Sequence, residues 1–231
     1  MNDTGRWGGF RCGLLRMHFG ILSGCADPEA KRGYEYLIRV GKRITTIDDF
    51  KRTFEIVKAA YSHNALKSSA HLREARLSLL NQLVEQMIIL ERAREQNIGI
   101  SDSEVEEVIA GIKKDYPEGE FDKTLLEYAI SYQSWREALK NRLLIEKVIA
   151  EELEEKVVIT PGIISEYYER NYDRFFLNSG SKEDSANINE FIIKHLRKEK
   201  VEEAYKDWIK ELKKNYKIEI NRERWEEIAS S

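Results

Sequence analysis

One long helical pattern constrains this chain more than any other feature of its sequence. Apolar residues recur every three or four positions from Leu72 through Leu83 to Leu90, and the segment ends at an Asn97-Ile98-Gly99 stop signal. A helix of this length makes about seven turns. We therefore expect it to form the spine against which the rest of the chain packs.

The composition supports a mainly α fold. The 231 residues include only three prolines and thirteen glycines, so few residues interrupt helices. A chain of this length can bury a hydrophobic core and accommodates one or two domains. We predict about six helices in a single helical domain over residues 37–221, followed by a C-terminal tail at 222–231.

The other helices are predicted where a capping residue precedes a helical stripe of apolar side chains. Ser101 to Glu104 form a capping box, and Ser131 to Ser134 indicate the cap of the helix that contains Trp135. Thr160 with Pro161 is a strong start signal, because proline at the first helical position loses no hydrogen bond. The expected helices run from about residue 46 to 61, 101 to 116, 125 to 130, 131 to 153, 160 to 176 and 189 to 215.

Short β segments are predicted near both ends of this domain. Residues 36–45 place β-branched and apolar side chains around Gly41, as a strand or short hairpin would. Residues 217–221 alternate between polar and apolar side chains, which is typical of a strand. We expect the C-terminal strand to pair with residues 37–40, so that the two ends close one domain.

The N-terminal segment carries a possible export signal. Leu22-Ser23-Gly24-Cys25 resembles a bacterial lipobox and follows three arginines, which predicts a signal segment at 1–25, lipidation of Cys25 and a polar tether at 26–36. The alternative is an irregular extension in which Cys25 is incidental, because the apolar run before it is short. No other apolar stretch approaches the roughly 20 residues of a membrane span. A lipid anchor is therefore expected, without a transmembrane helix.

Charge and motif content exclude several classes of function. Lys and Arg number 38 against 41 Asp and Glu, so the chain lacks the basic character of a nucleic-acid binder. Its four histidines are scattered, both cysteines lie in the first 25 residues, and no phosphate-binding glycine loop or zinc-protease motif occurs. We expect no enzyme activity, no cofactor and no metal site.

Three segments, taken in order, carry a family resemblance. They are LIRVGKRITTIDDFKRTF, LLNQLVEQMIILERAREQNIGISDSEVEEVIAGI and SYQSWREALKNRLLIEKVIAEELEEKVVITPGIISEYYERNYDRF. The first is similar to the entry strand and first helix of SurA-type periplasmic chaperones and related parvulin foldases, and the second to their long second helix and third helix. The third resembles the family's usual lead-in to an inserted parvulin domain. The resemblance to the family's N-terminal domain covers residues 36–221.

The resemblance also indicates what is absent between the last two long helices. In the family, a parvulin isomerase domain commonly follows the aromatic helix. Here only Leu177 to Ile188 separate that helix from the next. So short a segment buries too little apolar surface to form a packed domain around a proline-binding site. We expect a solvated loop at 177–188 and no prolyl isomerisation.

The function implied by the resemblance is that of an exported, ATP-independent holdase. It would bind unfolded or newly exported polypeptides in the periplasm or cell envelope. The short linker before Asn189 leaves open a monomer or a dimer with swapped C-terminal helices. The alternatives are an adaptor that holds one envelope partner and an isomerase without its catalytic domain. Exposed aromatic side chains can hold many sequences weakly, although each can instead pack in the core. The candidate contact residues are Tyr116, Tyr128, Tyr132, Tyr167, Tyr168, Tyr172, Phe176 and Trp225.

Overall fold

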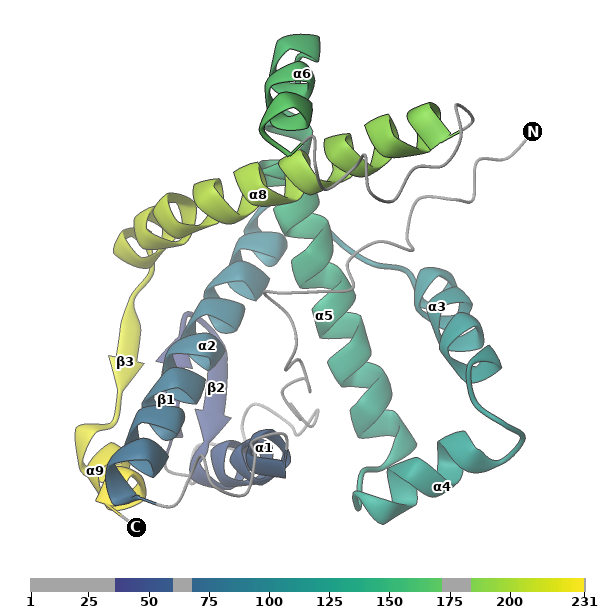
Figure 1. Ribbon diagram of the computed structural model, residues 1–231. Helices are drawn as coiled ribbons and strands as arrows, with labels where there is room; N and C mark the ends of the chain where they lie inside the picture. Colours follow the sequence, from purple (N-terminus) through teal and green to yellow (C-terminus); the bar gives the residue numbers. More distant parts are fainter. Residues whose placement is uncertain (1–35, 60–67, 172–183, 231) are drawn as a thin grey trace. The chain divides into compact units, whose positions relative to one another are not determined.

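The computed structural model describes residues 36–59, 68–171 and 184–230, and this part of the chain is mainly helical (Figure 1). It divides into two compact units. The large unit contains the described residues up to Val148 together with those from Lys213 onward, and the small unit is Ile149–Leu212. Cys25 and residues 26–35 of the predicted tether lie outside the described residues, whereas its last residue, Tyr36, begins a strand.

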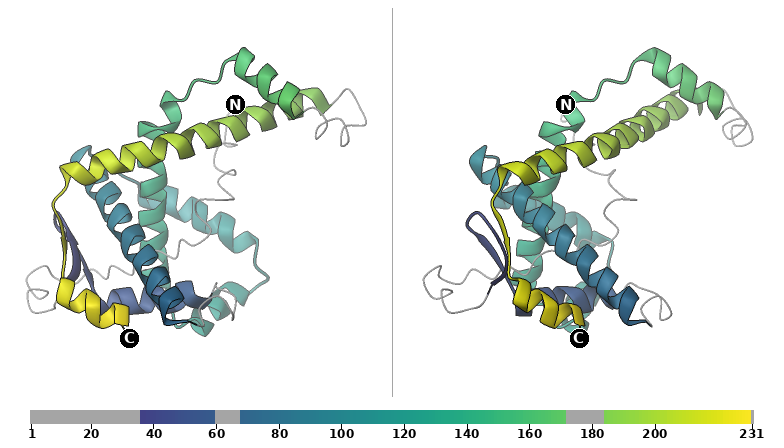
Figure 2. Two further views of the ribbon diagram at one scale, coloured as in Figure 1. Left: turned by 60° about the vertical axis from the view of Figure 1, so that its left-hand side comes forward. Right: turned by 90° about the vertical axis from the view of Figure 1, so that its left-hand side faces the viewer.

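A three-stranded antiparallel sheet joins the two ends of the large unit. The strands are β1 (Tyr36–Val40), β2 (Arg43–Thr46) and β3 (Ile218–Ile220), in the order β2-β1-β3. β3 runs beside β1 (Figure 2), with Arg39 opposite Glu219. It follows α8 (Asp184–Asn215) and precedes α9 (Arg222–Ser230). The predicted hairpin and its pairing with the C-terminal strand are therefore confirmed.

Helices α1 (Ile47–Ala59) and α2 (Ser69–Glu95) pack on this sheet. At the start of α1, the Thr46 hydroxyl accepts from the Asp49 N–H at 3.1 Å, and the Asp49 carboxylate accepts from the Thr46 N–H at 3.2 Å. These reciprocal bonds satisfy two of the donors that a helix start leaves open. The predicted helical stripes and β1 supply the core, which includes Leu37, Phe50, Phe54, Leu79, Leu83, Met87 and Leu90.

The turn between β1 and β2 contacts a buried carboxylate on α2. Gly41 has φ +57°, and a Cβ there would lie 2.8 Å from Oε2 of Glu91. Glu91, only 2% exposed, pairs with Arg94 at 2.9 Å and with Arg43 at 3.4 Å. Burial lowers the pKa of Arg43, and the charge of Glu91 opposes that shift. Glycine is therefore required at position 41 for both conformation and space.

The residues that lead into β3 also contact α2. Lys213 pairs with Glu85 at 2.7 Å, and the Tyr216 hydroxyl donates to Glu95 at 2.7 Å. Burial and this hydrogen bond both raise the pKa of Tyr216. These contacts fix the segment before β3 against α2, so that β3 follows next to β1.

A further helix follows β3 where a tail was expected. Helix α9 (Arg222–Ser230) buries Ile228 and Ala229 and packs on α2. The side chain of Asn221 accepts from the Arg224 N–H at 3.2 Å, which caps the helix start. The sequence signal for this helix was therefore an asparagine cap followed by apolar residues at helical spacing.

Helices α3 (Asp102–Lys114), α4 (Glu120–Glu127) and α5 (Tyr132–Glu152) follow one another, with α4 joining the far end of α3 to the start of α5 (Figure 1). The predicted capping box is confirmed: Ser101 and Glu104 exchange both backbone hydrogen bonds. The predicted Ser131 cap is also present, accepting from the Ser134 N–H at 3.1 Å. α3 and α5 share a core of Val105, Ile109, Leu139 and Leu143.

The small unit contains the 3-10 turn η2 (Glu154–Lys156), α6 (Pro161–Arg170) and most of α8 (Asp184–Asn215). The Thr160 hydroxyl accepts from the Ile163 N–H at 3.4 Å, so the predicted start of α6 is confirmed. α8 begins at Asp184, within the segment expected to be a loop. Its polar residues suggested a loop, but aspartate and serine are also common at helix starts.

None of the helices in the described part of the chain combines the length and hydrophobicity needed to cross a bilayer.

Candidate functional site

Exposed apolar side chains gather around α4. Half of the large apolar side chains that are exposed in the described chain come from residues 116–132. Leu126 is 81% exposed and Tyr128 is 58% exposed, while Tyr116 and Tyr132 are each 40% exposed. Burying apolar area is the main source of affinity for apolar ligands, so such a group is a candidate contact surface.

Helix α4 presents these side chains because its other face is anchored. Phe121 and Leu125 lie four residues apart on one side of α4 and form a small core with Ile130. Ile56 of α1, Ile112 of α3 and Trp135 of α5 pack against that core. With Leu125 facing inward, the next residue, Leu126, faces solvent. The exposed group therefore stands on a packed base.

Aromatic rings connect the three helices in a chain of contacts. The Phe121 ring lies edge-to-face with Tyr116 at 5.6 Å and with Trp135 at 4.8 Å between centroids. Trp135 in turn lies 5.9 Å from Tyr132. The Lys113 ammonium is 5.1 Å from the ring centroids of both Phe121 and Tyr132, within cation–π range. We define the aromatic corner as these four rings together with the exposed Leu126 and Tyr128 at the end of α4: Tyr116, Phe121, Leu126, Tyr128, Tyr132 and Trp135.

The backbone turns sharply at both ends of α4. Gly119 before the helix has φ +76°, and Ala129 after it has φ +51°. Glycine adopts this left-handed region freely, whereas alanine does so at a cost of roughly 1–2 kcal/mol. The left-handed conformation of Ala129 turns the chain so that Ile130 packs in the small core. The turn is closed by a hydrogen bond in which the Ile130 N–H donates to the Leu125 carbonyl at 2.9 Å.

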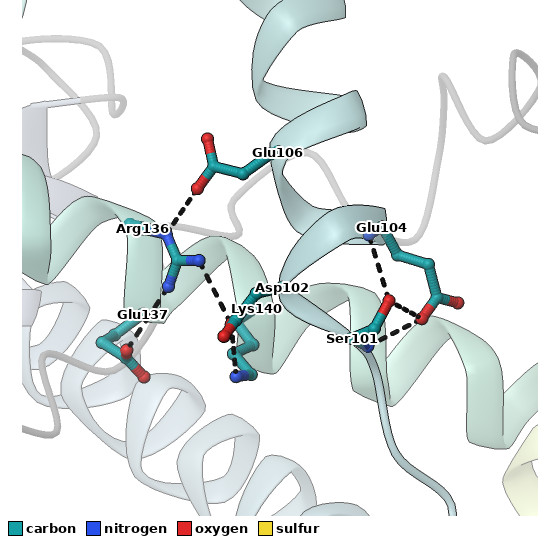
Figure 3. Close-up of polar contacts among 7 residues, drawn as sticks. All are labelled: Ser101, Asp102, Glu104, Glu106, Arg136, Glu137 and Lys140. Atoms are coloured by element: carbon teal, nitrogen blue, oxygen red, sulfur yellow. Dashed lines mark hydrogen bonds and ion pairs between the residues drawn. The ribbon is translucent and has the colours of Figure 1, made fainter.

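An ion-pair network fixes α3 to α5 beside the aromatic corner. Figure 3 shows the Arg136 guanidinium between three carboxylates, with Nε donating to Glu106 at 2.9 Å and Nη2 donating to Asp102 at 3.2 Å. Lys140 also donates to Asp102, at 3.1 Å. The bonds from Lys140 and Arg136 lower the pKa of Asp102, and those to Glu106 and Asp102 raise the pKa of Arg136.

The start of α3 is held to α5 by a second polar contact. Lys147 donates to the Gly99 carbonyl at 2.9 Å and lies 3.5 Å from a carboxylate oxygen of Glu104. Hydrogen bonds from the Ser101 backbone and hydroxyl lower the pKa of Glu104 (Figure 3). Exposed pairs contribute little one at a time, but together they define how α3 sits on α5.

The structure brings three of the eight predicted contact residues together. Tyr116, Tyr128 and Tyr132 all belong to the aromatic corner. Trp225 is half-buried and lies edge-to-face on Phe50 at 6.1 Å, within the core beside the sheet. Tyr172 and Phe176 lie outside the described residues.

The remaining two predicted residues, Tyr167 and Tyr168, are half-buried on α6 of the small unit. The Tyr167 ring lies 5.4 Å from that of His195, which stacks on Phe191 at 6.1 Å. Sequence reasoning missed Phe191 and Leu126 as exposed apolar residues. Leu126 lies in the helix predicted at 125–130 and Phe191 in the helix predicted at 189–215, and only packing shows which apolar residues of a helix face outward.

No cluster of histidine, cysteine and carboxylate side chains suited to a metal ion occurs among the described residues.

Comparison with known proteins identifies the family. SurA-like N-terminal domains match residues 10–149 of this chain, a region that contains the whole aromatic corner. The chain belongs to this family. The matched region ends where the small unit begins. The predicted resemblance to SurA-type chaperones is thereby confirmed.

Curated relatives agree with this assignment. The foldase protein PrsA of Clostridium acetobutylicum is 26% identical over 54% of this chain and 40% of its own length. PrsA of Clostridium botulinum is 25% identical over 72% of this chain and 52% of its own. The chaperone SurA of Nitrosospira multiformis is 23% identical over 50% of this chain and 26% of its own. The chain thus spans about a quarter to a half of the relatives it matches.

Proposed function

We propose that this protein is an ATP-independent chaperone that holds unfolded polypeptides at the aromatic corner. The observation that carries the proposal is the group of exposed apolar side chains at residues 116–132, supported by a packed base. Its relatives are named as foldases and a chaperone, and the matched domain contains the corner.

The size of the exposed group predicts weak binding. Covering a partly exposed Leu or Tyr side chain contributes about 1 kcal/mol, since full burial contributes roughly 1.5–3 kcal/mol. Four such side chains contribute about 4 kcal/mol, which corresponds to a dissociation constant near 1 mM. An unfolded client that makes several contacts is held more tightly than any single segment. Weak, adaptable binding of this kind suits a protein that must also release its client.

The test is suppression of aggregation. The full chain is mixed at near-stoichiometric ratio with a chemically denatured test protein, and light scattering is followed after dilution of the denaturant. Leu126→Gln combined with Tyr128→Gln is expected to remove at least half of the suppression.

The control is Leu77→Gln combined with Val158→Gln. These residues are 45% and 72% exposed and lie on α2 and before α6, away from residues 116–132 in the sequence. This variant is expected to retain full suppression. Equal losses in both variants, or no suppression by the unaltered chain, would refute the assignment of the corner as the holding surface.

A second candidate function is an adaptor for one folded partner. The ring contacts and ion pairs that hold the corner in one arrangement favour it, because a preorganised surface suits a partner of fixed shape. A defined stoichiometric complex from envelope extracts, with no affinity for unfolded chains, would support this function instead. Prolyl isomerisation is not part of either proposal.

We also propose that the protein acts outside the cytoplasm, anchored through Cys25. The support is the lipobox-like Leu22-Ser23-Gly24-Cys25 segment of the sequence. Cys25→Ala is expected to move the protein from the membrane fraction to a soluble or unprocessed form. Membrane retention of this variant would contradict lipid anchoring at that residue.

A further inference from the structure

The aromatic corner carries an unbalanced charge. Between residues 113 and 137 there are four basic and six acidic side chains, a net charge of 4 − 6 = −2. The basic residues are Lys113, Lys114, Lys123 and Arg136, and the acidic ones are Asp115, Glu118, Glu120, Asp122, Glu127 and Glu137.

The basic side chains of the corner are largely engaged. Arg136 pairs with Asp102 and Glu106, and Lys123 pairs with Glu120 at 3.3 Å. Lys113 lies over two rings of the corner. Only Lys114 has no partner among the described residues. The cations of this region therefore neutralise few of the acids beside the exposed apolar group.

Four exposed carboxylates remain without an ion pair within the described chain. They form what we call the acidic rim: Asp115, Glu118, Asp122 and Glu127. Asp122 lies one turn before Leu126 on the same face of α4, and Glu127 is adjacent to Tyr128. A segment that covers Leu126 and Tyr128 must therefore also approach these negative charges.

This charge argues against a second copy of the chain as the occupant. A two-fold dimer through the corner would bring its own rim against itself, because such an interface uses the same patch on both subunits. Like charges facing each other disfavour that contact. The chain as a whole is also acidic, with a net charge of −3.

We propose that the aromatic corner selects unfolded polypeptide segments in which apolar residues are interspersed with Lys or Arg. This inference rests on the proposed holding function and specifies its client class. The apolar side chains of the segment cover Leu126 and Tyr128, while its cations approach the acidic rim. The exposed ring of Tyr128 offers a further face for an arginine or lysine, as the rings of Phe121 and Tyr132 do for Lys113.

The test compares two unstructured, fluorescently labelled peptides that share the same aromatic and aliphatic residues. One carries Lys and the other Glu at the intervening positions. Anisotropy titration of the full chain is expected to show the Lys peptide binding about fivefold or more tightly at low salt, since each exposed pair contributes modestly. The difference should shrink in 0.5 M NaCl, about the range where screening shortens the reach of exposed charges to a few ångströms.

Neutralising the rim tests its role directly. Glu118→Gln with Asp122→Asn and Glu127→Gln is expected to abolish the preference for the Lys peptide and leave binding of the Glu peptide equal or stronger. The matched control is Glu74→Gln with Glu203→Gln and Asp207→Asn, three exposed acids outside residues 113–137. It should retain the preference.

The outcomes separate this inference from the proposed function. Equal binding of both peptides, or a preference that survives in the rim variant, would overturn the inference while aggregation suppression could stand. Failure of both peptides to bind, together with absent suppression, would overturn both. A dimer that dissociates on Leu126→Gln would show that the corner is occupied by a second copy and would also overturn the inference.

Discussion

Two regions of the large unit, the sheet end and the aromatic corner, contain similar side chains that differ in burial. At the sheet end, made by the sheet with α1, α2 and α9, Phe50 is fully buried and contacts the rings of Phe54 and Trp225. At the aromatic corner, Tyr128 and Leu126 remain exposed over a small core. Aromatic content alone therefore does not distinguish a buried, stabilising cluster from an exposed candidate contact surface. What differs is whether neighbouring elements cover the rings.

The difference extends to charge. Glu91 at the sheet end is buried and paired with Arg43 and Arg94. Removing either arginine leaves the buried carboxylate of Glu91 with less compensation for its lost hydration, which lowers stability. The acids of the corner are exposed and surrounded by water, where an unpaired charge has little effect on stability. Substitutions should therefore affect stability at one end and binding at the other.

The largest expected effect is from truncating a buried ring. Phe50→Ala should reduce the free energy of unfolding by about 3–5 kcal/mol, because it removes a fully buried side chain and leaves a cavity. Tyr128→Ala should change it by less than about 0.5 kcal/mol. Urea-induced unfolding followed by circular dichroism measures the free energy of unfolding of both variants. Similar decreases in the two would contradict the difference between the two regions.

The next effect concerns the turn over Glu91. Gly41→Ala should cost about 2 kcal/mol, since alanine is strained at φ +57° and its Cβ would meet the Glu91 carboxylate. Gly111→Ala on α3 is the control. A Cβ there meets nothing within 4 Å, so helix propensity should stabilise the protein by about 0.5–1 kcal/mol. If Gly41→Ala leaves the free energy of unfolding unchanged, the buried Glu91 carboxylate must be able to move away from the added Cβ.

Acid should weaken the network that positions the corner. The folded-state pKa values of Asp102 and Glu104 are lowered, so near pH 4 the unfolded chain binds more protons than the folded one. The stability that they contribute is present above their unfolded pKa values and is lost as the pH falls through the lower folded values. Asp102→Asn with Glu104→Gln should therefore flatten the fall in the urea midpoint below pH 5.

A matched control for the acid effect lies on the same helix. Glu107 is exposed and stands outside the α3–α5 ion pairs, so Glu107→Gln should leave the pH profile of the urea midpoint unchanged. If Asp102→Asn with Glu104→Gln leaves the pH dependence of the urea midpoint unchanged, the network between α3 and α5 does not contribute to folding stability.

The smallest effect is expected at the end of α4. Ala129→Gly should stabilise the protein by about 0.5 kcal/mol, because relief of the strain at φ +51° slightly exceeds the added entropy of glycine in the unfolded chain. The same change at Ala110, an exposed position within α3, should cost about 1 kcal/mol. Relative to the unaltered protein, the midpoint of thermal unfolding should rise for Ala129→Gly and fall for Ala110→Gly.

Prediction from sequence was most successful where the signal is local. The Ser101 capping box, the Ser131 cap and the Thr160-Pro161 start all occur as expected, because each depends on residues within one turn. Strand β3 was also predicted from alternation in a short segment, and its expected pairing with β1, which joins distant parts of the chain, is confirmed. Helix α9 was missed because its asparagine cap and its few apolar residues form a short and weak pattern.

The candidate site was predicted only in part. Tyr116, Tyr128 and Tyr132 were named from residue type, yet the same reasoning named Trp225, which packs on Phe50. Leu126 was read together with Leu125 as part of a brief apolar helix, but Leu125 is buried and Leu126 is the most exposed large apolar residue described. Periodicity alone cannot resolve two adjacent leucines in a helix of eight residues.

By itself the amino-acid sequence determined the mainly α class, the capped starts of α3, α5 and α6, the hairpin at Gly41 and, through the order of three segments, the family. The caps and the hairpin follow from interactions between residues close together in the chain. Only the tertiary structure decided that Glu91 lies beneath Gly41, that Trp225 covers Phe50 and that Leu126 is left uncovered. Burial depends on which distant elements meet, and that packing is set by the whole chain at once.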